Sequence, residues 1–97
     1  MPMQIFKLEN PNQNSHYQIM IVIAPDAKTA THIHPLYGYD GVVRHPSCLG
    51  GMTESKWYET PIEYQSDFCW CKKEDVLVTH IGVADAIYNK PLIICAY

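Results

Sequence analysis

The stretch "YQIMIVIA", residues 17–24, decides the fold. It is apolar at both odd and even positions and is rich in Ile and Val. Successive side chains of a strand point to opposite faces of its sheet, so a strand of this composition is typically covered on both faces. We therefore predict a central strand here, and the rest of the chain is interpreted around it.

The segments on either side of this strand predict a hairpin and a helix. Residues 3–9, "MQIFKLE", alternate like a half-buried edge strand, and residues 10–16, "NPNQNSH", favour turns, so the first two strands form a hairpin. Asp26 is positioned to cap a short helix that Pro35 ends. A helix of about nine residues is marginal alone and needs docking on the sheet.

Residues 36–67 form a long irregular excursion, in which only "GVVR", residues 41–44, indicates a strand. Further strands are predicted at residues 68–72, at "VLVTHIGV" (76–83) and at "PLIICAY" (91–97). We expect a single domain, 1–97, of the α+β class: one mainly antiparallel sheet of four to five strands with a single short helix and the excursion. The strands at 3–9 and 91–97 are candidates for edge pairing across a homodimer.

Composition excludes several functional classes. The 97 residues suit one folded domain, with 47% hydrophobic and 18% charged residues. The net charge of −3 and seven scattered basic residues argue against direct binding of nucleic acid. The longest apolar run, residues 19–25, is too short to span a membrane, and the first ten residues lack a signal-peptide pattern. With four cysteines and no secretory signal, we expect a cytoplasmic protein.

A zinc site is the first alternative that the residues allow. The candidate ligands are His45 and Cys48 in "HPSC" with Cys69 and Cys71 in "CWC". A pair of Cys-x-x-Cys motifs, which would be the strong signal, is absent, and free cysteines are commonly buried as small apolar residues. We therefore expect no metal and no cofactor, and structural zinc stays an alternative.

An enzyme is the second alternative. The chain has no GxGxxG, GxxxxGK[ST], HExxH or GxSxG motif. Cys48 with His45 or His80 can be drawn as a nucleophile and base, but no motif fixes the pair. We expect no enzymatic activity, and a Cys/His-centred enzyme stays an alternative.

The excursion has the composition of a protein-binding surface. Residues 56–70, "KWYETPIEYQSDFCW", interleave aromatic and acidic side chains, and Tyr and Trp give large contact areas. For Trp57, burial in the core is an equally weighted alternative. The acidic groups indicate a partner with basic groups, such as a nucleic-acid-handling protein. The predicted binding residues are Tyr37, Tyr39, Trp57, Tyr58, Glu59, Glu63, Tyr64, Asp67 and Trp70.

Two stretches carry a resemblance. "YQIMIVIAPDAKTATHIHP" near the start, and "DVLVTHIGVAD" followed by "PLIICAY" at the end, resemble small phage and prophage accessory proteins over roughly half of the chain. The resemblance implies an accessory protein that binds stoichiometrically to a host protein or ribonucleoprotein complex. It further implies inhibition of a defence or nucleic-acid-handling machine, as anti-CRISPR proteins do.

Overall fold

The computed structural model describes residues 3–47, 49–65 and 69–97. It has the predicted α+β class: six described strands accompany one short α-helix. No helix in these ranges has the length and apolarity needed to cross a membrane. The elements in chain order are β1 (Gln4–Glu9), β2 (Ile19–Ala24), α1 (Ala27–Ala30), β3 (Val42–Pro46), β4 (Met52–Lys56), the 3-10 turns η1 (Trp57–Glu59), η2 (Ile62–Tyr64) and η3 (Lys73–Asp75), β5 (Leu77–Val83) and β6 (Leu92–Ala96).

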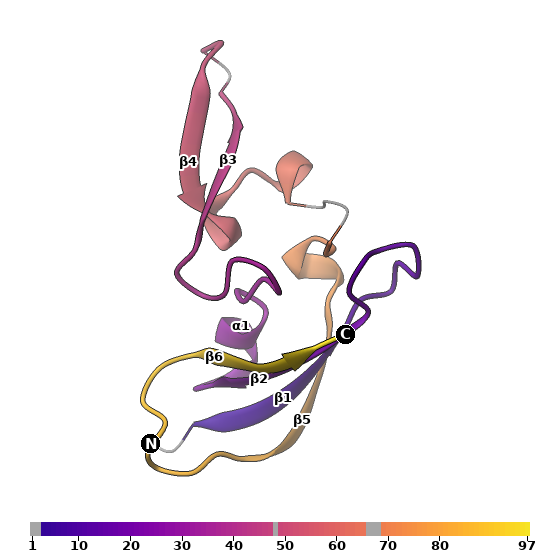
Figure 1. Ribbon diagram of the computed structural model, residues 1–97, viewed down its shortest axis with the longest axis vertical. Coiled ribbons are helices and arrows are strands. Elements are labelled where there is room, and N and C mark those ends of the chain that lie inside the picture. Colours follow the sequence, from indigo (N-terminus) through magenta and orange to yellow (C-terminus); the bar gives the residue numbers. More distant parts are fainter. Residues whose placement is uncertain (1–2, 48, 66–68) are drawn as a thin grey trace.

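Four strands form the main sheet in the order β5-β1-β2-β6, with every neighbour antiparallel (Figure 1). The apolar strand β2 is central, as predicted, and it forms the predicted hairpin with β1. The prediction that residues 3–9 form an edge strand is wrong, because β5 pairs with the free side of β1. The edges of the sheet are β5 and β6.

Both edge strands contain a register shift. The pairing of β1 with β5 skips Ile81, and the pairing of β2 with β6 skips Ile94. Such bulges break the ladder of backbone hydrogen bonds and increase the local twist, which makes an edge a poor template for a further strand.

One face of the sheet carries the main core. Side chains from the two inner strands, among them Phe6, Leu8, Met20 and Val22, pack against the segments after β2 and between β4 and β5. Those segments supply Ala30 and Ile33 near α1, then Trp57, Trp70, Cys71 and Val76. The excursion thus contributes Trp57 to the core, with Tyr39, Val43 and Tyr58 packed against it, and is not an addition to a finished platform.

The helix begins as predicted and ends early. The backbone N–H of Thr29 donates to Asp26 Oδ1 at 2.7 Å, which caps α1. The helix has only four residues, and the chain then makes a turn in which His34 is fully buried. The backbone N–H of Leu36 donates to His34 Nδ1 at 3.1 Å, so the buried ring has a partner inside the turn.

The excursion builds a second, two-stranded sheet from β3 and β4, which extends away from the main sheet (Figure 1). The strand predicted at residues 41–44 is confirmed within β3, whereas β4 was not predicted. The strand predicted at 68–72 is not formed by residues 69–72, and Phe68 lies outside the described residues.

Candidate functional site

The two tryptophans of the predicted binding surface are core residues. Trp57 is 2% exposed and Trp70 is fully buried. Trp57 Nε1 donates to the carbonyl oxygen of Gln65 at 3.0 Å, and Gln65 Nε2 donates to the carbonyl oxygen of Thr60 at 2.9 Å. These bonds hold the chain from η1 to η2 in a closed loop around the Trp57 ring. Burial was the equally weighted alternative for Trp57, and the structure shows it for both rings, so their predicted place in the binding surface is corrected.

Two tyrosines of the predicted surface are partly buried in a stack of rings. The Tyr58 ring lies 4.5 Å from the His32 ring at 15° and 5.6 Å from the Tyr39 ring at 21°. Lys56 Nζ lies 6.0 Å from the centre of the Tyr58 ring and 3.4 Å from Asp40 Oδ1. The stack attaches η1 to the turn after α1 and leaves Tyr39 and Tyr58 only partly exposed.

The exposed members of the predicted set gather near η1 and η2. Tyr37 and Tyr64 are 37% and 40% exposed, and Glu59 and Glu63 are exposed as well. Asp67 lies outside the described residues. The surface that remains is smaller than predicted, and it is acidic and phenolic rather than rich in tryptophan.

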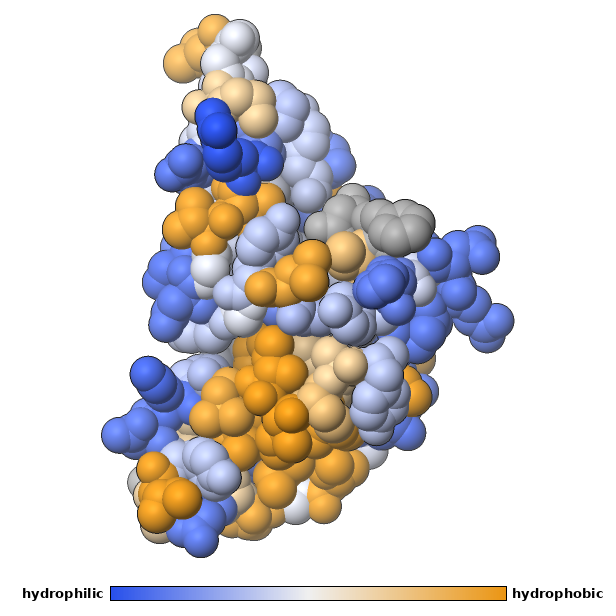
Figure 2. Space-filling view, viewed as in Figure 1, coloured by the Kyte–Doolittle hydropathy of each residue, from blue (hydrophilic) through white to orange (hydrophobic). Residues whose placement is uncertain are grey.

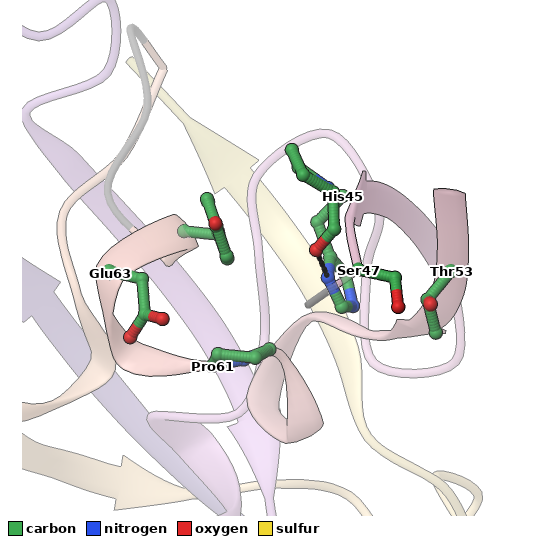
Figure 3. Close-up of a pocket in the computed structure, with 7 residues that line it drawn as sticks. His45, Ser47, Thr53, Pro61 and Glu63 are labelled. Carbon is green, nitrogen blue, oxygen red and sulfur yellow. Dashed lines mark hydrogen bonds between the residues drawn. The ribbon is translucent and has the colours of Figure 1, made fainter. Parts of the chain in front are cut away.

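This surface borders a pocket of about 370 Å³ between the β3–β4 hairpin and η2. Glu63 and Pro61 lie on one side, and His45, Ser47 and Thr53 lie on the hairpin side (Figure 3). Tyr64 completes the wall, with its ring 5.8 Å from the His45 ring and nearly parallel to it. The pocket was not predicted, because its two walls come from segments that the sequence does not link.

Hydrogen bonds fix the His45 ring in this wall. Its Nδ1 lies 3.2 Å from the carbonyl oxygen of Pro46, and its Nε2 lies 3.1 Å from Ser55 Oγ. Ser55 Oγ lies 2.9 Å from Thr60 Oγ1, whose hydroxyl group donates to the carbonyl oxygen of Lys56. This chain of bonds ties β3 to β4 and to the end of η1, so the pocket has a rigid back wall.

The alternative of structural zinc gains nothing from this geometry. Both nitrogens of His45 are engaged with protein atoms, Cys71 packs in the core, and Cys48 lies outside the described residues. Residues 3–47, 49–65 and 69–97 contain no cluster of three His, Cys, Asp or Glu side chains that could hold a metal ion. Burial raises the pKa of the Cys71 thiol to about 11, which disfavours the thiolate form that zinc binds.

The two candidate bases of the enzyme alternative lie in different sheets of the described structure. His80 Nε2 lies 2.7 Å from Gln4 Oε1, on the main sheet, where the His80 ring contacts Phe6 at 5.4 Å. His45 lies in the hairpin with Ser55. The third candidate, Cys48, is outside the part of the chain that the structure describes.

Comparison with protein-family models, with curated proteins and with solved structures found no match for this chain. The interpretation of the site therefore depends on its own geometry and chemistry.

Proposed function

We propose that this chain acts by stoichiometric binding to a host protein or ribonucleoprotein complex in the cytoplasm, and that it inhibits that complex as an anti-CRISPR protein does. The observation that carries the proposal is the pocket beside η2, where an exposed carboxylate and an exposed phenol ring flank a rigid, hydrogen-bonded wall. The resemblance of two stretches of the chain to phage accessory proteins supports the inhibitory role.

The chemistry of the pocket favours a basic side chain of the partner. Glu63 offers a carboxylate for an ion pair. The Tyr64 ring stacks on His45 with one face and is 40% exposed, and we propose that its other face receives a cation. The volume of about 370 Å³ lies at the low end of typical ligand pockets, which begin at about 300 Å³, and one long side chain fits it. An arginine of the partner, bound between Glu63 and Tyr64, is the contact that we expect at the centre of the interface.

Glu59 and the net charge of the protein also favour a basic partner. Glu59 lies on η1, next to this pocket in the chain, and the whole protein carries a net charge of −3. Charge of one sign steers a basic partner during encounter and discriminates against acidic surfaces. Proteins that bind nucleic acid carry such basic surfaces, so a nucleic-acid-handling complex fits the pocket and the charge together.

The experiment is a capture of proteins from host lysate, including CRISPR effector complexes, on the immobilised chain and four variants. Tyr64→Ala and Glu63→Lys remove the two recognition groups. Tyr88→Ala and Glu74→Lys are matched controls, because Tyr88 is 38% exposed against 40% for Tyr64 and Glu74 is exposed on η3. Circular dichroism verifies that each variant is folded.

We expect one host complex to be retained by the wild type and by both controls, and to be lost with Tyr64→Ala and Glu63→Lys. The retained complex should then show a fixed stoichiometry on titration and reduced activity when saturated. Capture that is equal for all five proteins, or that recovers no complex, contradicts the proposal.

A further inference from the structure

The main sheet has a second face, opposite the core, that is also apolar. Because Phe6, Leu8, Met20 and Val22 point into the core, their neighbours in β1 and β2 point the other way. The register pairs Ile5 with Ile23, Lys7 with Ile21 and Glu9 with Ile19 across this second face. We call it the open face: Ile5, Lys7, Glu9, Ile19, Ile21, Ile23, Leu77, Thr79, Leu92 and Cys95. The bulge residues Ile81 and Ile94 lie on the two edge strands that border it.

Much of this apolar surface is in contact with water. Leu77, Ile81 and Ile94 are 56%, 51% and 51% exposed, and Ile5, Ile19 and Ile21 are partly exposed. Figure 2 shows hydrophobic residues gathered over the lower half of the molecule, where the main sheet lies. These three half-exposed side chains lie on the two edge strands, with the partly exposed isoleucines of β1 and β2 between them.

The sequence of β2 is that of a strand buried on both faces. An antiparallel strand with one solvated face alternates between apolar and polar residues, and β2 instead reads IMIVIA. Within the described residues, a small cluster of Met3, Ile23 and Ala84 with Ile5 and Leu92 covers one end of the open face. The rest of the face combines Ile19, Ile21 and Leu77, which are partly or largely exposed, with the polar residues Lys7, Glu9 and Thr79.

We propose that a second copy of this chain covers the open face, so that two main sheets pack face to face in a symmetric dimer. A two-fold interface brings each surface against itself, so its charges must be self-complementary. The open face carries one lysine and one glutamate, Lys7 and Glu9, whose Nζ and Oε1 atoms lie 3.6 Å apart. Across a two-fold axis, each can pair with the opposite charge of the other copy.

The geometry favours this arrangement over pairing at the sheet edges. Bulges at Ile81 and Ile94 interrupt both edge strands, which opposes the addition of a strand from another copy. Sheets that pack face to face bury the side chains between them in a layer about 10 Å thick. Such a layer would cover the exposed side chain of Leu77 and the partly exposed isoleucines of the open face.

The dimer goes beyond the proposed binding function and does not depend on it. The pocket is lined by residues of the hairpin and of the segment around η2, and none of them belongs to the open face. Two copies joined through the sheet therefore leave both pockets free, and the dimer presents two binding sites to a partner with repeated subunits.

Sedimentation equilibrium of the purified chain tests the dimer without any partner. Leu77→Glu adds a charge on the open face, where Leu77 is 56% exposed, and Val42→Glu is the matched control, because Val42 is 53% exposed in the β3–β4 hairpin. Lys7→Glu and Glu9→Lys each give the face two like charges, and the mixture of these two variants restores opposite charges across the interface. Circular dichroism checks the fold of every variant.

We expect the wild type and Val42→Glu to sediment as dimers and Leu77→Glu as a monomer. Lys7→Glu and Glu9→Lys should each raise the dimer dissociation constant by at least about tenfold, and their equimolar mixture should recover a mixed dimer. A wild type that is monomeric up to its solubility limit overturns the proposal, as does a mixture of the two charge variants that stays monomeric. A wild-type monomer whose open face becomes protected only by a different protein also overturns it.

Discussion

Replacing Trp57 tests whether the excursion is part of the core. The ring is 2% exposed and donates one hydrogen bond from Nε1 to the carbonyl oxygen of Gln65. Trp57→Phe keeps most of the apolar volume and leaves that carbonyl group without its donor, which costs about 1–3 kcal/mol of unfolding free energy. Trp57→Ala also creates a cavity and should cost about 3–5 kcal/mol, a large share of a typical stability of about 5–15 kcal/mol.

Urea titration followed by far-UV circular dichroism measures both losses without relying on tryptophan fluorescence. Tyr88→Ala is the control, because that exposed side chain should change the unfolding free energy by less than about 0.5 kcal/mol. A loss below about 1 kcal/mol for Trp57→Ala, with an unchanged slope of the titration, would refute the reasoning. It would mean that η1 contributes little to the core and that residues 36–65 are attached only loosely to the sheet.

Three further predictions concern a turn and two titrating groups. A Cβ at Gly41 would collide with the backbone of Tyr37, whereas one at Gly51 would meet open space; Gly41→Ala should therefore lower the urea midpoint, and Gly51→Ala should leave it unchanged or slightly higher. Burial raises the pKa of the Cys71 thiol from 9.0 to about 11. The neutral thiol therefore stabilises the folded state below pH 9, and this part of the unfolding free energy should be lost as the pH rises towards 11. Cys71→Ser should flatten that decline, and a decline that is identical in both proteins would contradict the assignment. Burial, with Lys73 and Lys28 nearby, lowers the pKa of His32 below 6.5. The neutral ring's contribution to the unfolding free energy is therefore complete above pH 6.5 and should fall at lower pH. Comparing the unfolding free energies of the wild type and His32→Gln across that range measures this change.

The sequence predicted the elements whose local signals agree with their tertiary setting. The two-sided apolar run of β2 identified a central strand, turn residues predicted the β1–β2 hairpin, and Asp26 marked the start of α1. The order of strands was harder, because the half-buried pattern of β1 fits an edge strand as well as an inner one. Only the pairing with β5, about 70 residues later in the chain, decides between them.

The hairpin and the pocket had no usable sequence signal. The strand β4 reads MTESK, with polar residues at both odd and even positions, and neither face of it is deeply buried. Trp57 was ambiguous because an aromatic residue beside acidic ones suits both a core and a contact surface. Its burial depends on the bonds of Gln65 with Trp57 and Thr60, and the sequence alone does not specify these bonds.

The open face is the place where sequence pattern and single-chain structure disagree. The pattern of β2 predicted coverage of both faces, and the described chain covers one of them along its whole length. A second copy resolves this disagreement without any change in the fold of the chain.

The central claim is that one face of the main sheet packs on the core of its own chain and the other face packs on a second copy. The most direct test is an isotope-filtered NMR experiment on a mixture of labelled and unlabelled chains. Nuclear Overhauser effects between the two copies should arise from the methyl groups of Ile19, Ile21 and Leu77 on the open face. None should arise from Ile33 or Val22, which are buried in the core of one chain. Signals between copies that come only from hairpin residues such as Val42, or no such signals at concentrations near the solubility limit, would contradict the account.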